Sequence, residues 1–253
     1  MHIFVIGILF FVIAGPVWAQ DKVPSCAAMD RPCLMRQVEA LTPSIERQEW
    51  QDQTYRELAK TYAYEGQTDK AIALIDKIKT PDTQAMTIRG IGMAAASLKW
   101  SSSQYSQLFS TLSEKAKQIS HAPSQGIAYT YIAMSQAFAG DDAGARATAA
   151  TMSNAALRNK AYAETAEIQA ERGDIKNVLL SLEKVDASSF RNKAYDTVSR
   201  LFLDKAMVEE AYICATKIDN AYLKSKAIQR ILNKGNAEEQ DVEPNANLAD
   251  SPE

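Results

Sequence analysis

The sequence repeats itself at one fixed interval, the distance from Lys160 to Lys193, and this periodicity constrains the fold more than any other feature. Matching triplets recur at this repeat interval: Lys160-Ala161-Tyr162, Lys193-Ala194-Tyr195 and Lys226-Ala227-Ile228. The segments before them also match: Leu157-Arg158-Asn159, Phe190-Arg191-Asn192 and Leu223-Lys224-Ser225. The same interval separates Lys184-Val185-Asp186 from Lys217-Ile218-Asp219. Coincident matches at one spacing indicate internal duplication, which is typical of chains whose units bury their hydrophobic faces against their neighbours.

Each unit has the pattern of two helices. Val178, Leu179 and Leu182 form an apolar stripe at helical spacing, and Gly173-Asp174 interrupts the chain before it. A glycine can adopt the left-handed conformation at a helix end, and the following aspartate can cap the next helix; Gly140-Asp141 repeats this device. Good helix formers (Ala, Glu, Gln, Lys and Leu) fill the chain, and no segment alternates like a strand. The sequence therefore predicts an all-α fold.

We expect five helical units within residues 52–234, with these bounds: 52–82, 83–125, 126–158, 159–191 and 192–224. A capping segment (20–51) precedes them and a capping helix (225–234) follows. The second unit is longer than the others, and we place its extra length in enlarged turns near 99–104 and 121–125. Small residues fall at corresponding places in the first helices and let the paired helices approach closely: Ala59, Gly90, Ala133, Ala166 and Ser199.

The first unit carries a known repeat signature most clearly. Its matches, in order, are Tyr55 for Trp, Leu58-Ala59 for Leu-Gly, Tyr62 for Tyr, Ala71 and Ile75 for the second-helix Ala and Phe, and Pro81 for the closing Pro. On these residues, the units over about residues 52–224 resemble tetratricopeptide repeats.

The later units keep only part of this signature. Residues that keep a position are Tyr129, Tyr162 and Tyr195 for Trp, and Ala145 and Ala211 for the second-helix Ala. Residues that depart are Gln136 and Gln169 at the inner Tyr and Val178 at the second-helix Ala. The resemblance implies an α-solenoid of stacked antiparallel helix pairs in a right-handed superhelix. It also implies a concave groove, lined by the first helices, that holds proteins or peptides.

Residues 1–19 have the parts of a secretory signal. Residues 3–14 form an apolar run interrupted only by Gly7, followed by Gly15-Pro16 and Val17-Trp18-Ala19. This run is shorter than the about 20 apolar residues of a permanent transmembrane helix, and the residues before the expected cleavage site suit a signal peptidase. We expect cleavage after Ala19 and a periplasmic or secreted chain without a stable membrane span. The alternative is an uncleaved N-terminal anchor.

Export changes the interpretation of Cys26 and Cys33, which are expected to pair in an oxidising compartment. On one continuous helix their α-carbons would lie about 10 Å apart, beyond the reach of a disulfide. Cys26 must therefore precede the helix, and a boundary is supplied by Asp30 as a cap and Pro32 in the first turn. A metal pair and two free thiols are the alternatives. Cys214 is interpreted as a small buried apolar residue.

The charges argue against nucleic acid as a partner. The chain has 28 Lys and Arg against 31 Asp and Glu, a formal net charge of −3, so no strong field surrounds the whole protein. Residues 235–253 contain neither Lys nor Arg, and their acidic residues are Glu238, Glu239, Asp241, Glu243, Asp250 and Glu253. Low hydrophobicity and like charge predict a disordered, solvated tail.

No residue cluster amounts to a reaction centre. His2 lies in the signal, and His121 lies in an expected turn without a third group that would orient a base. The sequence contains no zinc-type His/Cys cluster and no phosphate-binding glycine loop. Glu164, Glu167 and Glu171 lie at helical spacing on one face, and such rows are usually solvated. We expect a noncatalytic protein without cofactor or metal; an enzyme that uses these carboxylates is an alternative.

What remains is the surface of the first helices. With the register of the resemblance, the groove-facing candidates are Arg56, Lys60, Tyr64, Thr87, Ile91, Met134, Phe138, Glu167, Glu171, Asp196 and Arg200. They change from basic and aromatic through apolar to acidic, which suits an extended polypeptide. For Met134 and Phe138 the alternative is burial in the core. The predicted function is an exported scaffold that binds a protein or peptide partner; a purely structural component of the cell envelope is a further alternative.

Overall fold

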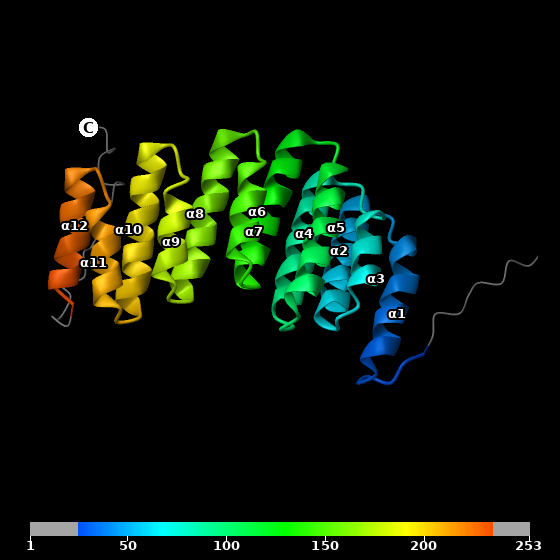
Figure 1. Cartoon of the computed structure of the whole chain (residues 1–253). Helices are drawn as coiled ribbons and strands as arrows, with labels where there is room; N and C mark the ends of the chain where they lie inside the picture. Colours follow the sequence, from blue (N-terminus) through cyan, green and yellow to red (C-terminus); the bar gives the residue numbers. More distant parts are fainter. Residues whose placement is uncertain (1–24, 235–253) are drawn as a thin grey trace, which may run out of the picture.

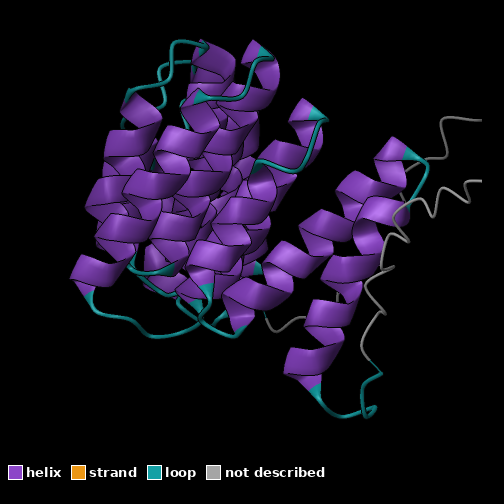
Figure 2. Ribbon diagram, turned by 90° about the vertical axis from the view of Figure 1, so that its right-hand side faces the viewer, coloured by secondary structure: helices purple, strands orange, loops and turns teal. Residues whose placement is uncertain are grey.

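The computed structural model describes residues 25–234, so the signal peptide expected at 1–19 and the acidic tail expected at 235–253 lie outside the described residues. The described chain contains 12 α-helices and one short 3-10 helix, without strands (Figure 2), which confirms the all-α prediction. In chain order the elements are α1 (Arg31–Leu41), η1 (Thr42–Ser44), α2 (Gln48–Tyr64), α3 (Thr68–Ile75), α4 (Pro81–Ala96), α5 (Ser102–Lys117), α6 (Ala122–Phe138), α7 (Asp142–Ala150), α8 (Ala155–Glu171), α9 (Ile175–Leu182), α10 (Ser188–Asp204), α11 (Val208–Thr216) and α12 (Ala221–Leu232).

Helices that follow one another in the chain are neighbours in space. Figure 1 shows them in a row, with α1 at one end and α12 at the other. Helices α2, α4, α6, α8 and α10 pack on one another in this order, and each also packs against the helix that follows it. The last helix, α12, packs against α10 and α11. We call the even-numbered helices from α2 the first helices, and α3, α5, α7, α9 and α11 the second helices, of successive hairpins.

The first helices begin at regular intervals, at Gln48, Pro81, Ala122, Ala155, Ser188 and Ala221. Every step equals the repeat interval of the sequence except the step from Pro81 to Ala122, which is longer. The extra length lies mainly in α5, which has 16 residues where α3 has 8, so the expectation of enlarged turns is wrong. Apolar residues at helical spacing continue along α5 and keep it in the core: Tyr105, Leu108, Phe109, Leu112 and Ala116.

The turn inside each hairpin holds one residue in the left-handed region. In three hairpins this residue is Gly66, Gly140 or Gly173, with φ of 72°, 84° and 81°. In these turns the next amide donates back to a helix carbonyl at 2.8 to 2.9 Å, which closes the helix end. Lys99 and Ala206 hold the same place in the other two hairpins, with φ of 53° and 63°, where a β-carbon is unfavourable.

These left-handed residues set the register of the second hairpin. Because Lys99 follows Gly66 by one repeat interval, the residue equivalent to Ala59 is Gly92, two positions after the expected Gly90. Gly92 is buried, and a β-carbon there would lie 2.5 Å from Oγ of Ser135 on α6. The close approach of α4 and α6 therefore requires glycine at this position.

The Arg-Asn pairs noted in the sequence fasten the hairpins. In α8/α9 the side-chain oxygen of Asn159 accepts from the amide of Asp186 at 3.2 Å, and Arg158 donates to the carboxylate of the same Asp186 at 2.9 Å. The equivalent contacts in α10/α11 join Arg191, Asn192 and Asp219. The matched sequences thus hold the start of a first helix against the end of its second helix.

A pair of buried side chains, one near the C-terminal end of each helix, lies between the two helices of both hairpins. In α8/α9 the hydroxyl of Ser181 donates to Oε1 of Gln169 at 2.9 Å, and α6/α7 has the same kind of bond. In α10/α11 the corresponding residues are Phe202 and Cys214, both fully buried. The expectation for Cys214 is confirmed, and burial raises the pKa of its thiol to about 12, so that it stays protonated at neutral pH.

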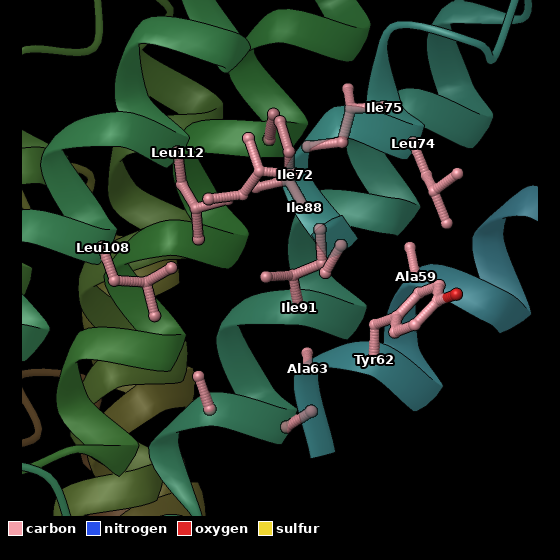
Figure 3. Close-up of a cluster of buried hydrophobic side chains, with 14 of the residues drawn as sticks. Ala59, Tyr62, Ala63, Ile72, Leu74, Ile75, Ile88, Ile91, Leu108 and Leu112 are labelled. Atoms are coloured by element: carbon pink, nitrogen blue, oxygen red, sulfur yellow. The ribbon is translucent and has the colours of Figure 1, made fainter. Parts of the chain in front are cut away.

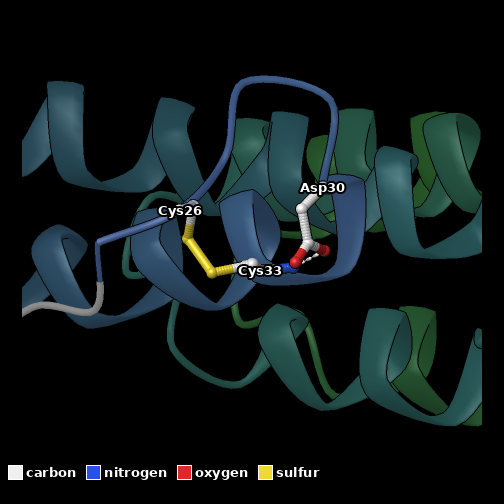
Figure 4. Close-up of a disulfide and its surroundings, with 3 residues drawn as sticks. All are labelled: Cys26, Asp30 and Cys33. Carbon is white, nitrogen blue, oxygen red and sulfur yellow. Dashed lines mark hydrogen bonds between the residues drawn. A yellow bond between two sulfur atoms is a disulfide. The ribbon is translucent and has the colours of Figure 1, made fainter.

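The predicted disulfide staples the N-terminal segment. Cys26 and Cys33 are bonded, with their α-carbons 5.7 Å apart (Figure 4). Asp30 caps α1 by accepting from the amide of Cys33 at 3.0 Å, and Pro32 lies in the first turn. Cys26 precedes the helix, as the spacing required.

Candidate functional site

One face of the first helices is hollowed along several hairpins. The central hollow, of about 360 Å³, is shared by α4, α6, α8 and α10 and is lined by Arg89, Met93, Met134, Phe138, Glu164, Glu167, Ile168, Glu171, Thr197 and Leu201. A hollow of about 190 Å³ between α2 and α4 shares Arg89 and Met93 with it. A hollow of about 310 Å³ between α8 and α10 shares Glu164, Glu167 and Thr197 with it. We call the surface formed by these three hollows the first-helix face.

Most of the predicted groove residues line this face: Arg56, Lys60, Tyr64, Met134, Phe138, Glu167 and Glu171. Tyr64 and Phe138 are about half exposed, so the alternative of a core position does not apply to Phe138. Asp196 instead pairs with Arg230 of α12, and Arg200 is exposed without lining any of the three hollows. That these residues bind a partner stays a prediction.

Thr87 and Ile91, which were expected in the groove, are fully buried. Figure 3 shows Ile91 within the cluster of hydrophobic side chains, and this placement corrects the prediction. The register of the second unit was displaced by two positions, and the side chains that face the hollow are those of Arg89 and Met93. Lys99 lies one repeat interval after Gly66 and has the same left-handed conformation, which gives the correct register of the second unit. This register was not recognised in the sequence, because a lysine does not usually indicate a left-handed turn.

The α8 side of the central hollow is acidic. Glu164 lies 3.5 Å from the ammonium of Lys160, and Glu171 lies 3.4 Å from that of Lys205. Glu167 projects into the same hollow and forms no ion pair with another described residue. Burial raises the pKa of Glu167, and the neighbouring carboxylate of Glu164 raises it further. The charges of Arg200 and Lys193 lower this pKa, so a cationic group placed here would share the Glu167 carboxylate with these two side chains.

The α2/α4 end of the face is basic and aromatic. Arg56, Lys60 and Arg89 line the hollow there beside Tyr64, and one carboxylate, Glu57, pairs with Arg56 at 2.8 Å. The guanidinium of Arg89 also lies 5.4 Å from the ring centre of Tyr131, a contact that holds its position. The face thus changes from basic, through apolar side chains at its middle, to acidic, and it can contact a polypeptide that carries a matching gradient.

A serine, a histidine and an aspartate meet at the starts of α4 and α6, but not as a catalytic triad. The hydroxyl of Ser124 donates to the carboxylate of Asp82, and Nδ1 of His121 lies 2.7 Å from the Ser124 oxygen. In a nucleophilic triad the histidine lies between hydroxyl and carboxylate and takes the hydroxyl proton. Here the serine occupies the middle and is fully buried, so the cluster joins two helix starts. Sequence reasoning missed Asp82 because it lies in a different hairpin.

Within residues 25–234, no three His, Cys, Asp or Glu side chains are grouped so that they could hold a metal ion. None of the described helices has the length and hydropathy needed to cross a bilayer.

No protein-family model matches the chain, and a search of curated proteins gives no match.

Proposed function

We propose that this chain is an exported, noncatalytic α-solenoid of tetratricopeptide-like hairpins, wound as a right-handed superhelix, which binds a protein or peptide partner in its concave groove. The observation that carries the proposal is the hollow shared by α4, α6, α8 and α10. A surface contributed by successive hairpins can contact several consecutive residues of an extended polypeptide.

The chemistry of the first-helix face describes the partner. The basic end suits acidic residues, and the half-exposed aromatic side chains of Tyr64 and Phe138 offer anchors for apolar ones. The carboxylate of Glu167, which forms no direct ion pair within the described residues, suits a basic residue next to the apolar contact. The proposed ligand is therefore a segment whose charge changes from acidic to basic across an apolar centre.

The Cys26–Cys33 disulfide supports export, because such bonds persist mainly in oxidising compartments. We place the chain in the periplasm or outside the cell. Mass spectrometry of the N-terminus of the exported protein should show a chain that begins at Gln20; a chain that retains residues 1–19 would indicate the uncleaved anchor instead.

Site-specific crosslinking in the native cell tests the binding surface. A photoreactive residue in place of Phe138 should capture a partner, whereas one in place of Leu180 should not. Leu180 is a matched control because it is 40 % exposed, against 50 % for Phe138, but lies on α9 away from the first-helix face. Equal capture at both positions, or at neither, would contradict the proposal.

Charge reversal gives a second test of the same surface. Lys60→Glu and Arg89→Glu should weaken capture at position 138, because both side chains line the adjoining hollow. Capture that is unchanged after Arg56, Lys60 and Tyr64 are all replaced would exclude the basic end. A turnover abolished by Glu167→Gln would favour an enzyme, and stable stoichiometric copurification with the envelope would favour the structural alternative.

A further inference from the structure

The two ends of the described chain have the features of two halves of one hairpin. Helix α1 packs on α2 as α3 packs on α4, so α1 occupies the place of a second helix. Ile45, which follows α1, precedes the core residue Ile78 by one repeat interval and supports this register. At the other end α12 starts one repeat interval after α10 and packs on α10 and α11, as a first helix does. Within residues 25–234, α1 has no first helix of its own and α12 has no second helix.

A hollow marks the place beside α1 where a first helix would stand. It measures about 400 Å³ and is lined by Arg31, Leu34, Met35, Val38, Gln53, Thr54, Glu57, Leu58 and Thr61. Gln53, Thr54 and Glu57 are the sixth, seventh and tenth residues of α2. In α10, the sixth, seventh and tenth residues line the hollow between α10 and the preceding first helix, α8. The hollow therefore lies on the side of α2 that, in α10, faces a neighbouring first helix.

The apolar residues of α1 are exposed where those of α3 are buried. Val38 is 39 % exposed and Leu41 is 46 % exposed. Their counterparts one repeat interval later, Ala71 and Leu74, are 0 % and 1 % exposed, because α3 packs against α2 within its hairpin. The exposed positions on α1 are thus the ones that contact a first helix elsewhere in the molecule.

Helix α12 exposes a matching position. Leu232 is 72 % exposed and corresponds to Ser199, whose hydroxyl donates to the carbonyl of Ala211 on α11 at 2.8 Å. Ala211 follows the left-handed residue Ala206 by as many positions as Ala71 follows Gly66, so Ala211 and Ala71 are equivalent. Val38 on α1 is the counterpart of Ala71, and Ala211 therefore corresponds to Val38. A hairpin formed by α12 and the α1 of another molecule would bring Leu232 against Val38.

We infer that copies of this chain associate head to tail, with α12 of one copy in the hollow beside α1 and α2 of the next. The new contact continues the interface by which successive first helices already pack. It joins two different surfaces, so it leaves a free end on each copy and produces a series of oligomers rather than a closed dimer. This association does not depend on partner binding at the first-helix face.

Charged residues of both signs meet at the proposed junction. Lys226 is exposed on α12, and Glu57, exposed on α2, pairs with Arg56 of its own helix at 2.8 Å. The residues at the same helix positions in α8 and α10, Lys160 and Thr197, line one shared hollow. The head-to-tail contact would therefore bring an ammonium group near a carboxylate.

Sedimentation velocity of the full chain, over a series from micromolar to millimolar concentration, tests the inference. We expect monomers, dimers and larger species whose proportion rises with concentration. Val38→Glu and Leu232→Glu should each give monomers, because each places a carboxylate in an apolar junction. An equimolar mixture of these two variants should form dimers and nothing larger, because each copy keeps one competent end. Leu180→Glu, at a position as exposed as Val38, should assemble like the unchanged chain.

Three results would overturn the inference. The first is an unchanged chain that stays monomeric at every concentration, in which case residues outside 25–234 or another protein occupy the hollow. The second is assembly that both charge variants leave intact. The third is a mixture of the two variants that remains monomeric although circular dichroism shows each variant to be as helical as the unchanged chain. If Val38→Glu is less helical, Leu41→Gln takes its place in the experiment.

Discussion

Hairpins α8/α9 and α10/α11 have equal length and align without gaps, yet they fill corresponding core positions with different side chains. Both are held at their ends by the Arg-Asn contacts to an aspartate. Three of the positions at which they differ bear on the core and the turn: α8/α9 has Gln169, Gly173 and Ser181, and α10/α11 has Phe202, Ala206 and Cys214. The two members of the buried pair change together, from a hydrogen-bonded polar pair to an apolar pair. The comparison teaches that the end contacts preserve the register of the hairpin. The two members of the buried pair need only suit each other, either as hydrogen-bonded polar groups or as apolar groups.

The largest effect is expected where the apolar pair fills the core. Phe202→Ala removes a fully buried ring and should lower the free energy of unfolding by about 3 to 5 kcal/mol. Urea unfolding followed by circular dichroism measures the loss. Phe190→Ala on the same helix is the control, because its side chain is partly exposed and should cost much less. Equal losses would show that position 202 is not a core position.

Exchanging the small members of the two pairs should destabilise both hairpins. Ser181→Cys leaves Gln169 with a weak thiol donor, and Cys214→Ser places a hydroxyl beside Phe202; each should cost about 1 to 3 kcal/mol in urea unfolding. The matched control is Cys214→Ser in the background of Phe202→Gln, where the new hydroxyl has a partner and should partly restore stability. No restoration would contradict the idea of matched pairs.

The turn residues predict opposite effects of exchanging alanine and glycine. Ala206→Gly should raise the unfolding free energy by about 1 kcal/mol, because it relieves an alanine at φ 63°, and Gly173→Ala should lower it by a similar amount. Thermal unfolding of the two variants measures the difference in Tm. A lower Tm for Ala206→Gly would mean that the chain entropy of glycine outweighs the relieved strain.

The smallest effect is expected at the exposed end contact. Arg191→Ala should cost about 1 kcal/mol, because it removes the pair with the exposed carboxylate of Asp219 and one bond that Arg191 donates to the carbonyl of Val185 at 3.1 Å. Asn192→Ala should cost more, since it removes the acceptor for the Asp219 amide from a buried position. Urea unfolding should show a larger loss of unfolding free energy for Asn192→Ala than for Arg191→Ala. The reverse result would show that the ion pair, and not Asn192, holds the register of the hairpin.

Features that depend on neighbouring residues were predictable from the sequence. Asp30, Pro32 and the spacing of the two cysteines placed the start of α1 and the disulfide correctly, because a cap and its helix lie close together in the chain. Gly140 and Gly173 likewise marked turns, because their conformations favour glycine.

Errors occurred where the same conformation is held by a residue that does not favour it. Lys99 is left-handed without being glycine, so the second unit was displaced, and Thr87 and Ile91 were assigned to the groove. Asp82 and Ser124 were not connected at all, because their contact depends on how two hairpins pack. Sequence signals for such contacts are weak, since any of several residue types can fill the space once the packing is established.

The sequence established the periodicity, the helices and the disulfide, because capping, turn formation and apolar spacing act over short stretches of chain. Packing between hairpins decided which side of each first helix faces solvent. It also decided that Arg89 and Met93 line the first-helix face and that α1 and α12 are left with exposed apolar residues. These outcomes depend on close approaches such as that of Gly92 to Ser135, and an approach of this kind is determined by two helices together rather than by the residues along either one.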